Sequence, residues 1–275
     1  MARSSSFRGY SLVELLVALA LGVIISAAAL QMFVSSQQSA GFQRGMTDIQ
    51  SSGRFALDFL RDDLWKAGDS TVSDPTAAIL TAASESPGNL ISSNAATAGI
   101  NLNDQLVMRF FASTPGVDCE GNNYAANVYI ISRYFVRTDA DTGLSALACD
   151  ASSDDKTTAT NTNTAGQVII AGVDSFQVLY GVDDGLPAAG IAQVNRYVTS
   201  TQYLAIAAPR PAILSVRIGL LLSSTELVAA AALAPTQDYW VLDNQIVANT
   251  VPADGRARRL FVGTIALKNF DRNGV

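Results

Sequence analysis

Residues 8–22 read RGYSLVELLVALALG, an apolar run with a single acid inside it. The apolar character continues to Val34, so the candidate segment is Leu12–Val34, interrupted by Glu14, Gly22, Ser26 and Gln31. At a rise of about 1.5 Å per residue this segment reaches roughly 34 Å as a helix, which is long enough to cross the hydrocarbon core of a bilayer. The stretch therefore predicts a membrane-spanning helix that carries Glu14 near its start.

The basic residues around this segment predict its orientation. Arg3 and Arg8 lie just before it, whereas the first basic residue after it is Arg44. Cytoplasmic flanks of membrane helices are enriched in Lys and Arg. We therefore expect the amino end to stay in the cytoplasm and everything after Val34 to be exported.

The helical pattern continues beyond the apolar segment, without a proline before position 75. One apolar stripe recurs at spacings of mostly three and four, which is typical of an amphipathic helix. Its members are Phe42, Met46, Ile49, Gly53, Ala56, Leu57, Leu60, Leu64 and Ala67. We expect one helix from Tyr10 to Ala67, about 85 Å long, with Gly68 as its stop. Glycines at 41, 45 and 53 weaken this helix and predict a bend near Gly41.

The remainder of the chain alternates β-type runs with polar, turn-forming segments. The expected strands are Gln105–Phe111, Val128–Arg137, Gln167–Ile170, Ser175–Tyr180, Ile213–Leu222, Tyr239–Leu242 and Arg259–Lys268. A turn at 139–143, DADTG, predicts a hairpin whose return strand carries Cys149. The fold class is therefore α+β: a long N-terminal helix packed on a C-terminal antiparallel β-sheet domain.

Three segments are less regular. Residues 69–103 read as a long surface connection that leaves room for a short strand or turn, and the low-complexity stretch SSDDKTTATNTNTAG reads as a mobile loop. The run ELVAAAALA at 226–234 is too short for periodicity to separate a short helix from an apolar loop.

Composition excludes several classes of function. The chain has 275 residues, no histidine and a net charge of −6. The missing histidine removes the commonest general base and metal ligand, so we expect no enzyme, no cofactor and no metal site. The acidic balance disfavours a general nucleic-acid partner.

The two cysteines are too far apart for a short metal-binding motif. If the body of the protein is exported, Cys119 and Cys149 most simply form a disulfide. Closing a loop of roughly 30 residues would stabilise the fold by about 3 to 4 kcal/mol in the chain-entropy model. The alternative is a pair of buried free thiols.

The N-terminal stretch resembles the class III signal of type IV pilins. The features that carry this resemblance are a basic leader, Gly9, the aromatic Tyr10, then Ser11 and Glu14, followed by about twenty mostly apolar residues. The resemblance implies that a prepilin peptidase cuts between Gly9 and Tyr10 and methylates the new amino terminus. It also implies that Glu14 meets the terminal amine of a neighbouring subunit in the filament.

Three simpler interpretations of this stretch remain open. Ser11 and Glu14 form S-x-x-E, so the glutamate could serve only as part of a capping box. The run could be an ordinary secretion signal cut near the small residues 26–29, which leaves a plain secreted domain. It could also be an uncleaved membrane anchor.

Patches in the rest of the chain resemble the PilW-type minor pilins. They are SSGRFALDFLRDDLWKAGD, VDSFQVLYGVDDG, AILSVRIGLLLSS and RRLFVGTIALKN, in that order along the sequence. Asp69 and Ser70 stand where many relatives continue with glycine and cysteine, so an additional disulfide of some relatives is missing. The resemblance implies four segments: a leader (1–9), a transmembrane or filament-core helix (10–34), an amphipathic half-helix (35–68) and a β-rich periplasmic or extracellular head (69–275).

The function that this resemblance implies is that of a minor pilin in a tip or priming complex of the type IV pilus. The implied partners are other minor and major pilins, the prepilin peptidase and a large tip adhesin. The implied location is the inner membrane, as a single-pass protein with its head in the periplasm, and afterwards the cell-surface pilus. The alternatives are a J-type pseudopilin of type II secretion and, from another class, an exported enzyme on an anchor.

Other charged groups have simpler interpretations. The carboxylates in DADTG and at Asp183 and Asp184 predict turns rather than calcium ligands. Asp62 and Asp63 predict a solvated helix face, and Asp58 lies at ion-pair spacing from both Arg54 and Arg61. The arginines at 256, 258 and 259 form the densest basic cluster, which predicts salt bridges or solvated side chains rather than a DNA site.

Overall fold

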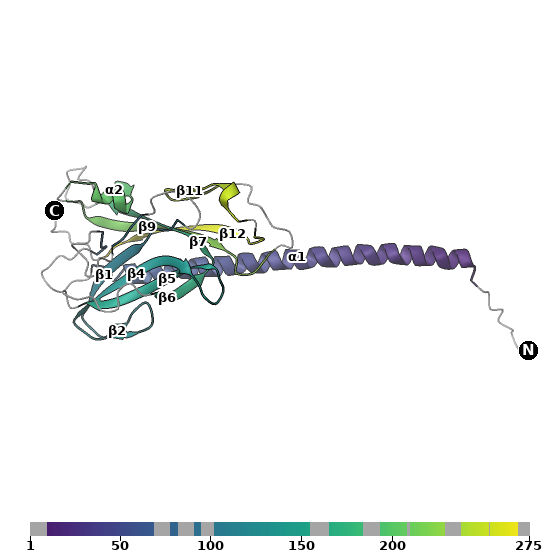
Figure 1. The fold of residues 1–275 in the computed structure, drawn as a ribbon, viewed down its shortest axis with the longest axis horizontal. Helices are drawn as coiled ribbons and strands as arrows, with labels where there is room; N and C mark the ends of the chain where they lie inside the picture. Colours follow the sequence, from purple (N-terminus) through teal and green to yellow (C-terminus); the bar gives the residue numbers. More distant parts are fainter. Residues whose placement is uncertain are drawn as a thin grey trace, which may run out of the picture.

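The computed structural model describes residues 10–68, 78–81, 91–94, 102–154, 165–183, 193–207, 210–228, 238–252 and 254–268. A single helix, α1 (Leu12–Leu64), occupies the N-terminal part and extends far beyond the rest of the molecule (Figure 1). Its 53 residues correspond to about 80 Å. The helix therefore starts two residues later and ends three residues earlier than the sequence predicted.

The end of the helix has an identifiable cause. Residues 65–68 form a turn in which Gly68 takes a positive φ of 76°, a conformation that glycine adopts readily. The Gly68 amide then donates to the Arg109 carbonyl at 2.9 Å. Gly68 is the expected stop, and its hydrogen bond fastens the end of α1 to the first strand of the head.

The bend predicted near Gly41 is absent from the helix, which stays α-helical through Gly41, Gly45 and Gly53. These glycines instead lie on the side of the helix that meets the head. A Cβ atom at Gly53 would come within 2.6 Å of the Phe261 ring. The glycines permit close packing against the head, and this packing compensates for their weak helix propensity.

The head is built on two four-stranded antiparallel sheets. The first has the order β1–β4–β5–β6, made of β1 (Leu106–Ala112), β4 (Val128–Thr138), β5 (Ser145–Asp154) and β6 (Gln167–Ala171). The second has the order β12–β9–β7–β8, made of β12 (Arg258–Ala266), β9 (Ile213–Ser223), β7 (Val173–Val182) and β8 (Arg196–Val198). The predicted α+β class is thus confirmed.

Smaller elements complete the described part of the chain. Two short hairpins are formed by β2 (Gly116–Val117) with β3 (Asn123–Tyr124) and by β10 (Tyr239–Val241) with β11 (Asn244–Ile246). A short helix α2 (Ser200–Leu204) and a 3-10 turn (Ala248–Thr250) also occur. All seven predicted strands are present with ends within two residues, whereas β2, β3, β8, β11 and α2 were not predicted.

The chain passes from one sheet to the other at Gly172, which separates β6 from β7. Gly172 has a φ of 79°, and an added Cβ would collide with the Ser223 carbonyl oxygen. Its amide donates to Ser145 of β5 at 2.8 Å, and its carbonyl accepts from the Ser223 amide at 2.7 Å. A single residue therefore hydrogen-bonds to strands of both sheets.

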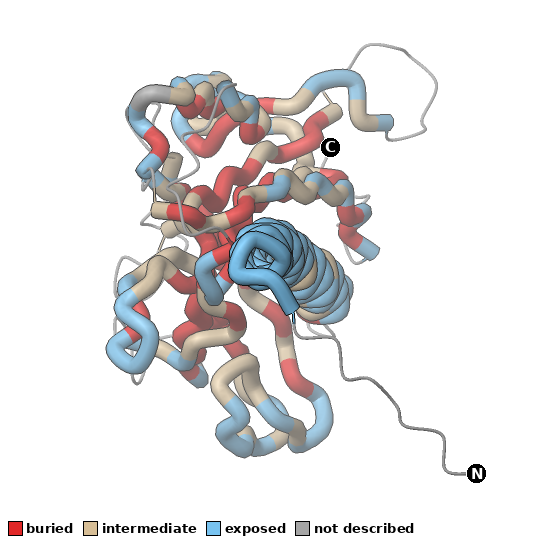
Figure 2. Tube along the Cα trace, turned by 90° about the vertical axis from the view of Figure 1, so that its right-hand side faces the viewer, coloured by how far each residue is buried: buried red, intermediate tan, exposed pale blue. Residues whose placement is uncertain are grey.

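The second half of α1 packs along β12, β9 and β6, so it contacts an outer strand of each sheet. Figure 2 looks along the helix and shows the buried segments of the two sheets gathered behind it. The predicted stripe supplies six buried members, Ile49, Gly53, Ala56, Leu60, Leu64 and Ala67. Phe42 is a correction: it is 45% exposed, because the head covers the helix beside Gly41 and Gly45 rather than at position 42.

Candidate functional site

The start of α1 is organised by Ser11. The Ser11 hydroxyl accepts a hydrogen bond from the Glu14 amide at 3.2 Å, which satisfies one of the free donors of the first turn. Tyr10, which precedes this cap, is 85% exposed. Gly9 lies outside the described residues. Ser11 therefore stabilises the helix start through the Glu14 backbone.

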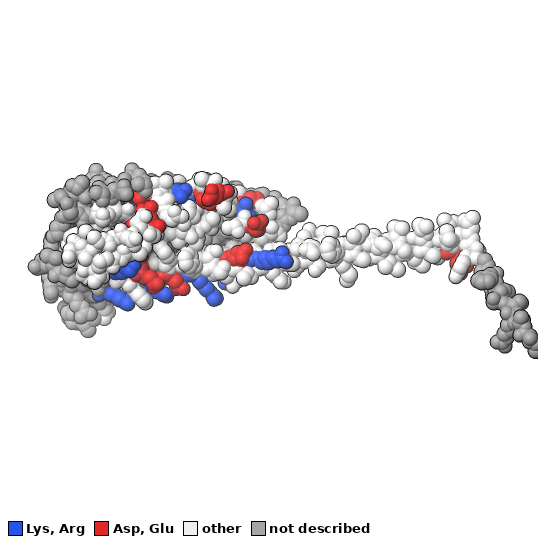
Figure 3. All heavy atoms as spheres, turned by 90° about the horizontal axis from the view of Figure 1, so that it is seen from below, with Lys and Arg blue, Asp and Glu red and all other residues white. Residues whose placement is uncertain are grey.

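The first half of α1 stands clear of the head. Every residue from Leu12 to Ser39 is exposed, and the most apolar 18-residue window has a mean hydropathy of 2.5 with none of it buried. An exposed apolar surface of this size marks a membrane or protein contact. Figure 3 shows this half of the helix as a white rod with one acidic spot, from Glu14, near its N-terminal end.

The head first contacts the helix at a junction that we call the clasp, made of segments 224–228 and 254–258. The Val228 amide donates to the Gly255 carbonyl at 2.9 Å, and the Ser224 amide donates to the Ala257 carbonyl, also at 2.9 Å. An added Cβ at Gly45 would collide with the Val228 side chain. The clasp holds Val228, which is 4% exposed, against the glycine surface of the helix.

The arginines at 256 and 258 hold the clasp together. Arg258 pairs with Asp174 at 2.7 Å and with Asp254 at 2.8 Å, while its side chain is only 3% exposed. Arg256 donates to the Ser224 carbonyl at 2.6 Å. The predicted salt bridges are present for both residues, since Arg256 also lies 3.9 Å from Asp254.

Burial makes Asp174 depend on Arg258 as its counter-charge. Desolvation raises the pKa of the Asp174 carboxyl above its ordinary value, and the nearby Arg258 guanidinium opposes this rise. Removing the cation would leave a buried carboxylate without its main counter-charge, which is far more destabilising than losing an exposed pair. The ion pair is therefore a structural part of the clasp.

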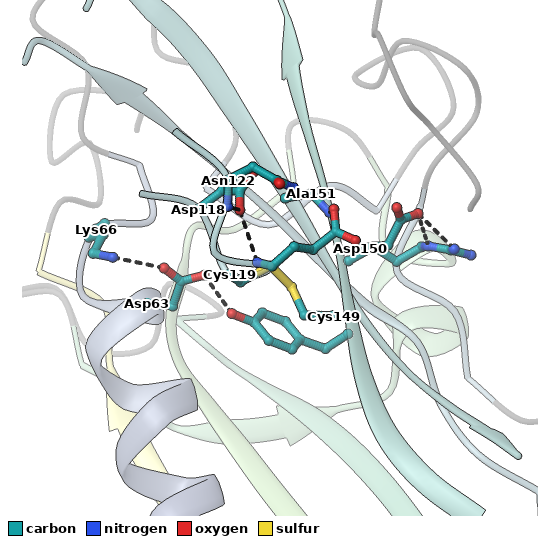
Figure 4. Close-up of a disulfide and its surroundings, with 11 residues drawn as sticks. Asp63, Lys66, Asp118, Cys119, Asn122, Cys149, Asp150 and Ala151 are labelled. Carbon is teal, nitrogen blue, oxygen red and sulfur yellow. Dashed lines mark hydrogen bonds and ion pairs between the residues drawn. A yellow bond between two sulfur atoms is a disulfide. The ribbon is translucent and has the colours of Figure 1, made fainter. Parts of the chain in front are cut away.

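A second junction lies at the other end of the helix–head contact (Figure 4). The Tyr134 hydroxyl of β4 donates to Asp63 at 2.5 Å, and Lys66 pairs with the other Asp63 oxygen at 3.0 Å. Burial, followed by the Asp63 charge, raises the pKa of Tyr134 well above its ordinary value. The predicted solvated face is wrong for Asp63, which is buried because its side chain faces the buried Tyr134 of β4.

The structure contains a disulfide between Cys119 and Cys149, with the two Cα atoms 6.1 Å apart. It joins the β2–β3 hairpin to β5. Two contacts support the same attachment (Figure 4): Asp118 accepts from the Asn122 amide at 2.8 Å, and Glu120 accepts from the Ala151 amide at 3.0 Å. Burial raises the pKa of Glu120. The described residues include no free cysteine.

The remaining charged candidates have structural roles. Asp139 accepts from the Thr142 amide and hydroxyl and shapes the predicted turn between β4 and β5. Asp58 pairs with Arg61 at 2.9 Å, one of the two predicted pairings. Over the described part of the chain, no group of three or more His, Cys, Asp or Glu side chains is placed to hold a metal ion.

The sequence singled out Arg256 and Arg258 as a basic cluster, but it identified neither their partners nor Val228. Val228 falls in a run whose periodicity was undecided, and Asp174 has no local partner because Arg258 lies 84 residues away. One signal was present: Gly41 and Gly45 are one helical turn apart, a spacing of small residues that lets another chain segment approach a helix closely.

Two family models match the chain. The model described as Type IV Pilus-assembly protein W matches residues 133–269, and the model described as Prokaryotic N-terminal methylation motif matches residues 4–30. The first match includes three of the four patches that resemble PilW-type proteins. The second includes the segment with Gly9, Tyr10 and Glu14.

Among solved structures, the chain is similar to a type IV-like pilin from Thermus thermophilus. The identity is 16%, the TM-score is 0.45, and the alignment covers 82% of this chain and 98% of that chain. No curated protein matches the sequence.

A long apolar helix joined to an antiparallel β head, together with these two matches, defines a pilin-like subunit. The chain belongs to the PilW family of type IV pilus-assembly proteins and is a minor pilin of pilus assembly. Its methylation motif and apolar helix indicate a membrane-anchored pilin.

Proposed function

We propose that the chain is made as a precursor, is cut between Gly9 and Tyr10, and then uses Glu14 to meet the terminal amine of a neighbouring subunit. The observation that carries this proposal is the isolation of one acid on an apolar rod. Glu14 is the only charged residue between Leu12 and Gln43, in a half-helix that the head does not cover.

The energetics favour a partner for this acid. A carboxylate near the centre of a membrane costs on the order of 2 to 3 kcal/mol on insertion scales, and less towards an end. A carboxylate buried in a bundle of neighbouring apolar helices is unfavourable for the same reason. Cleavage before Tyr10 creates a positive amine close to the level of Glu14, so a neighbour displaced along the bundle axis supplies the missing counter-charge.

Two variants separate charge pairing from helix capping. Glu14→Gln keeps a capping residue and the backbone amide bonded to Ser11, but it removes the charge. Ser11→Ala removes the cap, which is worth about 0.5 to 2 kcal/mol, and leaves the charge. We expect Glu14→Gln to reduce the number of surface pili strongly and Ser11→Ala to have a small effect. Normal piliation with Glu14→Gln would refute charge pairing.

The cleavage site has a direct test. Sequencing the amino terminus of the mature protein should give an N-methylated Tyr10, and Gly9→Val should leave the precursor uncut. A mature chain that starts near residues 26–29 would instead establish an ordinary secretion signal.

We also propose that residues 69–275 form a periplasmic head, that the protein acts in the priming complex at the filament tip, and that its role is structural rather than catalytic. This proposal depends on the sequence patches shared with PilW-type minor pilins. Gold labelling of an epitope on the head should mark pilus ends, and co-purification should recover other minor pilins. Label along the whole filament would contradict the tip position.

A further inference from the structure

Two large apolar side chains remain exposed at the end of the head that faces the apolar half of α1. Phe42 on the helix is 45% exposed, and Leu227 in the clasp is 64% exposed. They belong to segments far apart in sequence, yet Val228, next to Leu227, lies against Gly45 and approaches Gly41. Phe42 and Leu227 therefore lie at nearly the same level along the helix axis.

This level can be measured from the end of the apolar segment. Gly41 follows Val34 by seven residues, which corresponds to about 10 Å of helix. Helical side chains point back towards the N-terminus, so the Phe42 ring covers the turn before its own Cα. That brings the ring to roughly 7 Å beyond Val34. The headgroup layer on one side of a bilayer is about 5 to 8 Å thick.

The chemistry of this end also fits the edge of a membrane. Arg44, the first basic residue after the span, follows Phe42 by two positions in α1 and is exposed. Its long side chain likewise points back along the helix. Aromatic rings and snorkelling cations at the ends of a span are the usual anchors in the membrane–water interface.

We propose that, before assembly, the base of the head rests on the membrane surface, with Phe42 and Leu227 inserted among the lipid headgroups. The inference builds on the membrane anchoring in the proposed function. Tilted spans are common, at about 20° on average, and a head that contacts lipid on the side of Leu227 would fix the direction of that tilt. The contact would be released when the subunit is extracted into the filament.

Labelling single cysteines tests this inference in the full-length protein. Because both native cysteines are in the disulfide, an added thiol can be labelled alone. Phe42→Cys and Leu227→Cys report on the base of the head. Val117→Cys, in β2 and 53% exposed, is the matched control on a part of the head far from the span (Figure 1). Ser26→Cys reports on the span.

The four labelled proteins are placed singly in phosphatidylcholine nanodiscs that contain quencher lipids. A headgroup quencher should quench the fluorophores at 42 and 227 at least threefold more than the one at 117, and an acyl-chain quencher should quench the one at 26. Equal quenching at 42, 227 and 117, with quenching retained at 26, would overturn the membrane contact alone. Loss of quenching at 26 would overturn the anchoring itself and, with it, this inference.

Discussion

Replacing Gly45 by alanine tests whether the clasp is packed as closely as the structure indicates. An alanine methyl at position 45 collides with Val228, whose short branched side chain is buried and whose amide is bonded to Gly255. One turn earlier, Gly41 is the matched control. Its methyl would lie 4.0 Å from the Val228 carbonyl oxygen, an ordinary van der Waals contact.

The expected magnitudes follow from two opposing terms. Alanine in place of glycine inside a helix stabilises by about 0.8 to 1 kcal/mol, and this gain applies to both positions. Overpacking a buried site typically costs about 1 to 3 kcal/mol and applies only to Gly45→Ala. We therefore expect Gly41→Ala to raise the free energy of unfolding by up to about 1 kcal/mol, and Gly45→Ala to be neutral or destabilising by up to about 2 kcal/mol.

The measurement is urea unfolding of the full-length protein in detergent, followed by tryptophan fluorescence. The difference between the two single variants isolates the packing term, because the helix propensity cancels. Combining Gly45→Ala with Val228→Ala should recover part of the difference, since the colliding methyl groups are then removed. If Gly45→Ala stabilises the protein as much as Gly41→Ala does, close packing at the clasp is refuted.

Three further predictions concern the Tyr134 hydrogen bond, the disulfide and the buried ion pair of Arg258. Tyr134→Phe should lower the free energy of unfolding by about 1 to 3 kcal/mol in urea titrations, because it leaves a buried carboxylate oxygen without its donor. Since the folded pKa of Tyr134 is raised above its ordinary value of 10.0, its contribution should be complete below pH 10 and decline above it, a decline that Tyr134→Phe should reduce. Replacing Cys119 and Cys149 by serine should lower stability by about 3 to 4 kcal/mol, and reduction of the native protein should match this loss. Arg258→Met should cost about 3 to 5 kcal/mol, and adding Asp174→Asn should restore part of it; full additivity in a double-mutant cycle would contradict the buried pair.

The elements that the sequence predicted well depend on local patterns. The seven strands are runs of β-branched and aromatic residues, and the turn at 139–143 uses the side chain of Asp139 together with Gly143. The helix is amphipathic over its second half, so its buried stripe followed from spacing alone. Periodicity predicts such features because neighbouring residues determine them.

The junctions were harder to predict because they depend on residues far apart in the chain. The partner of Asp63 is Tyr134, 71 positions later, so a pair of helix acids gave no sign that one of them is buried. The glycines of α1 suggested a bend, because helix propensity alone reports only that glycine destabilises a helix. Their effect depends on Val228 and Phe261, whose positions no local pattern specifies.

The two junctions together determine how the head bears mechanical load. The clasp grips the helix at Gly45, and Asp63 is bound near its end, about 27 Å further along. A pull along the filament axis would therefore act in shear on all contacts between these points at once, instead of peeling them apart in turn. Because Gly172 ties both sheets together, the head should follow the helix as one rigid block when a filament is stretched or retracted.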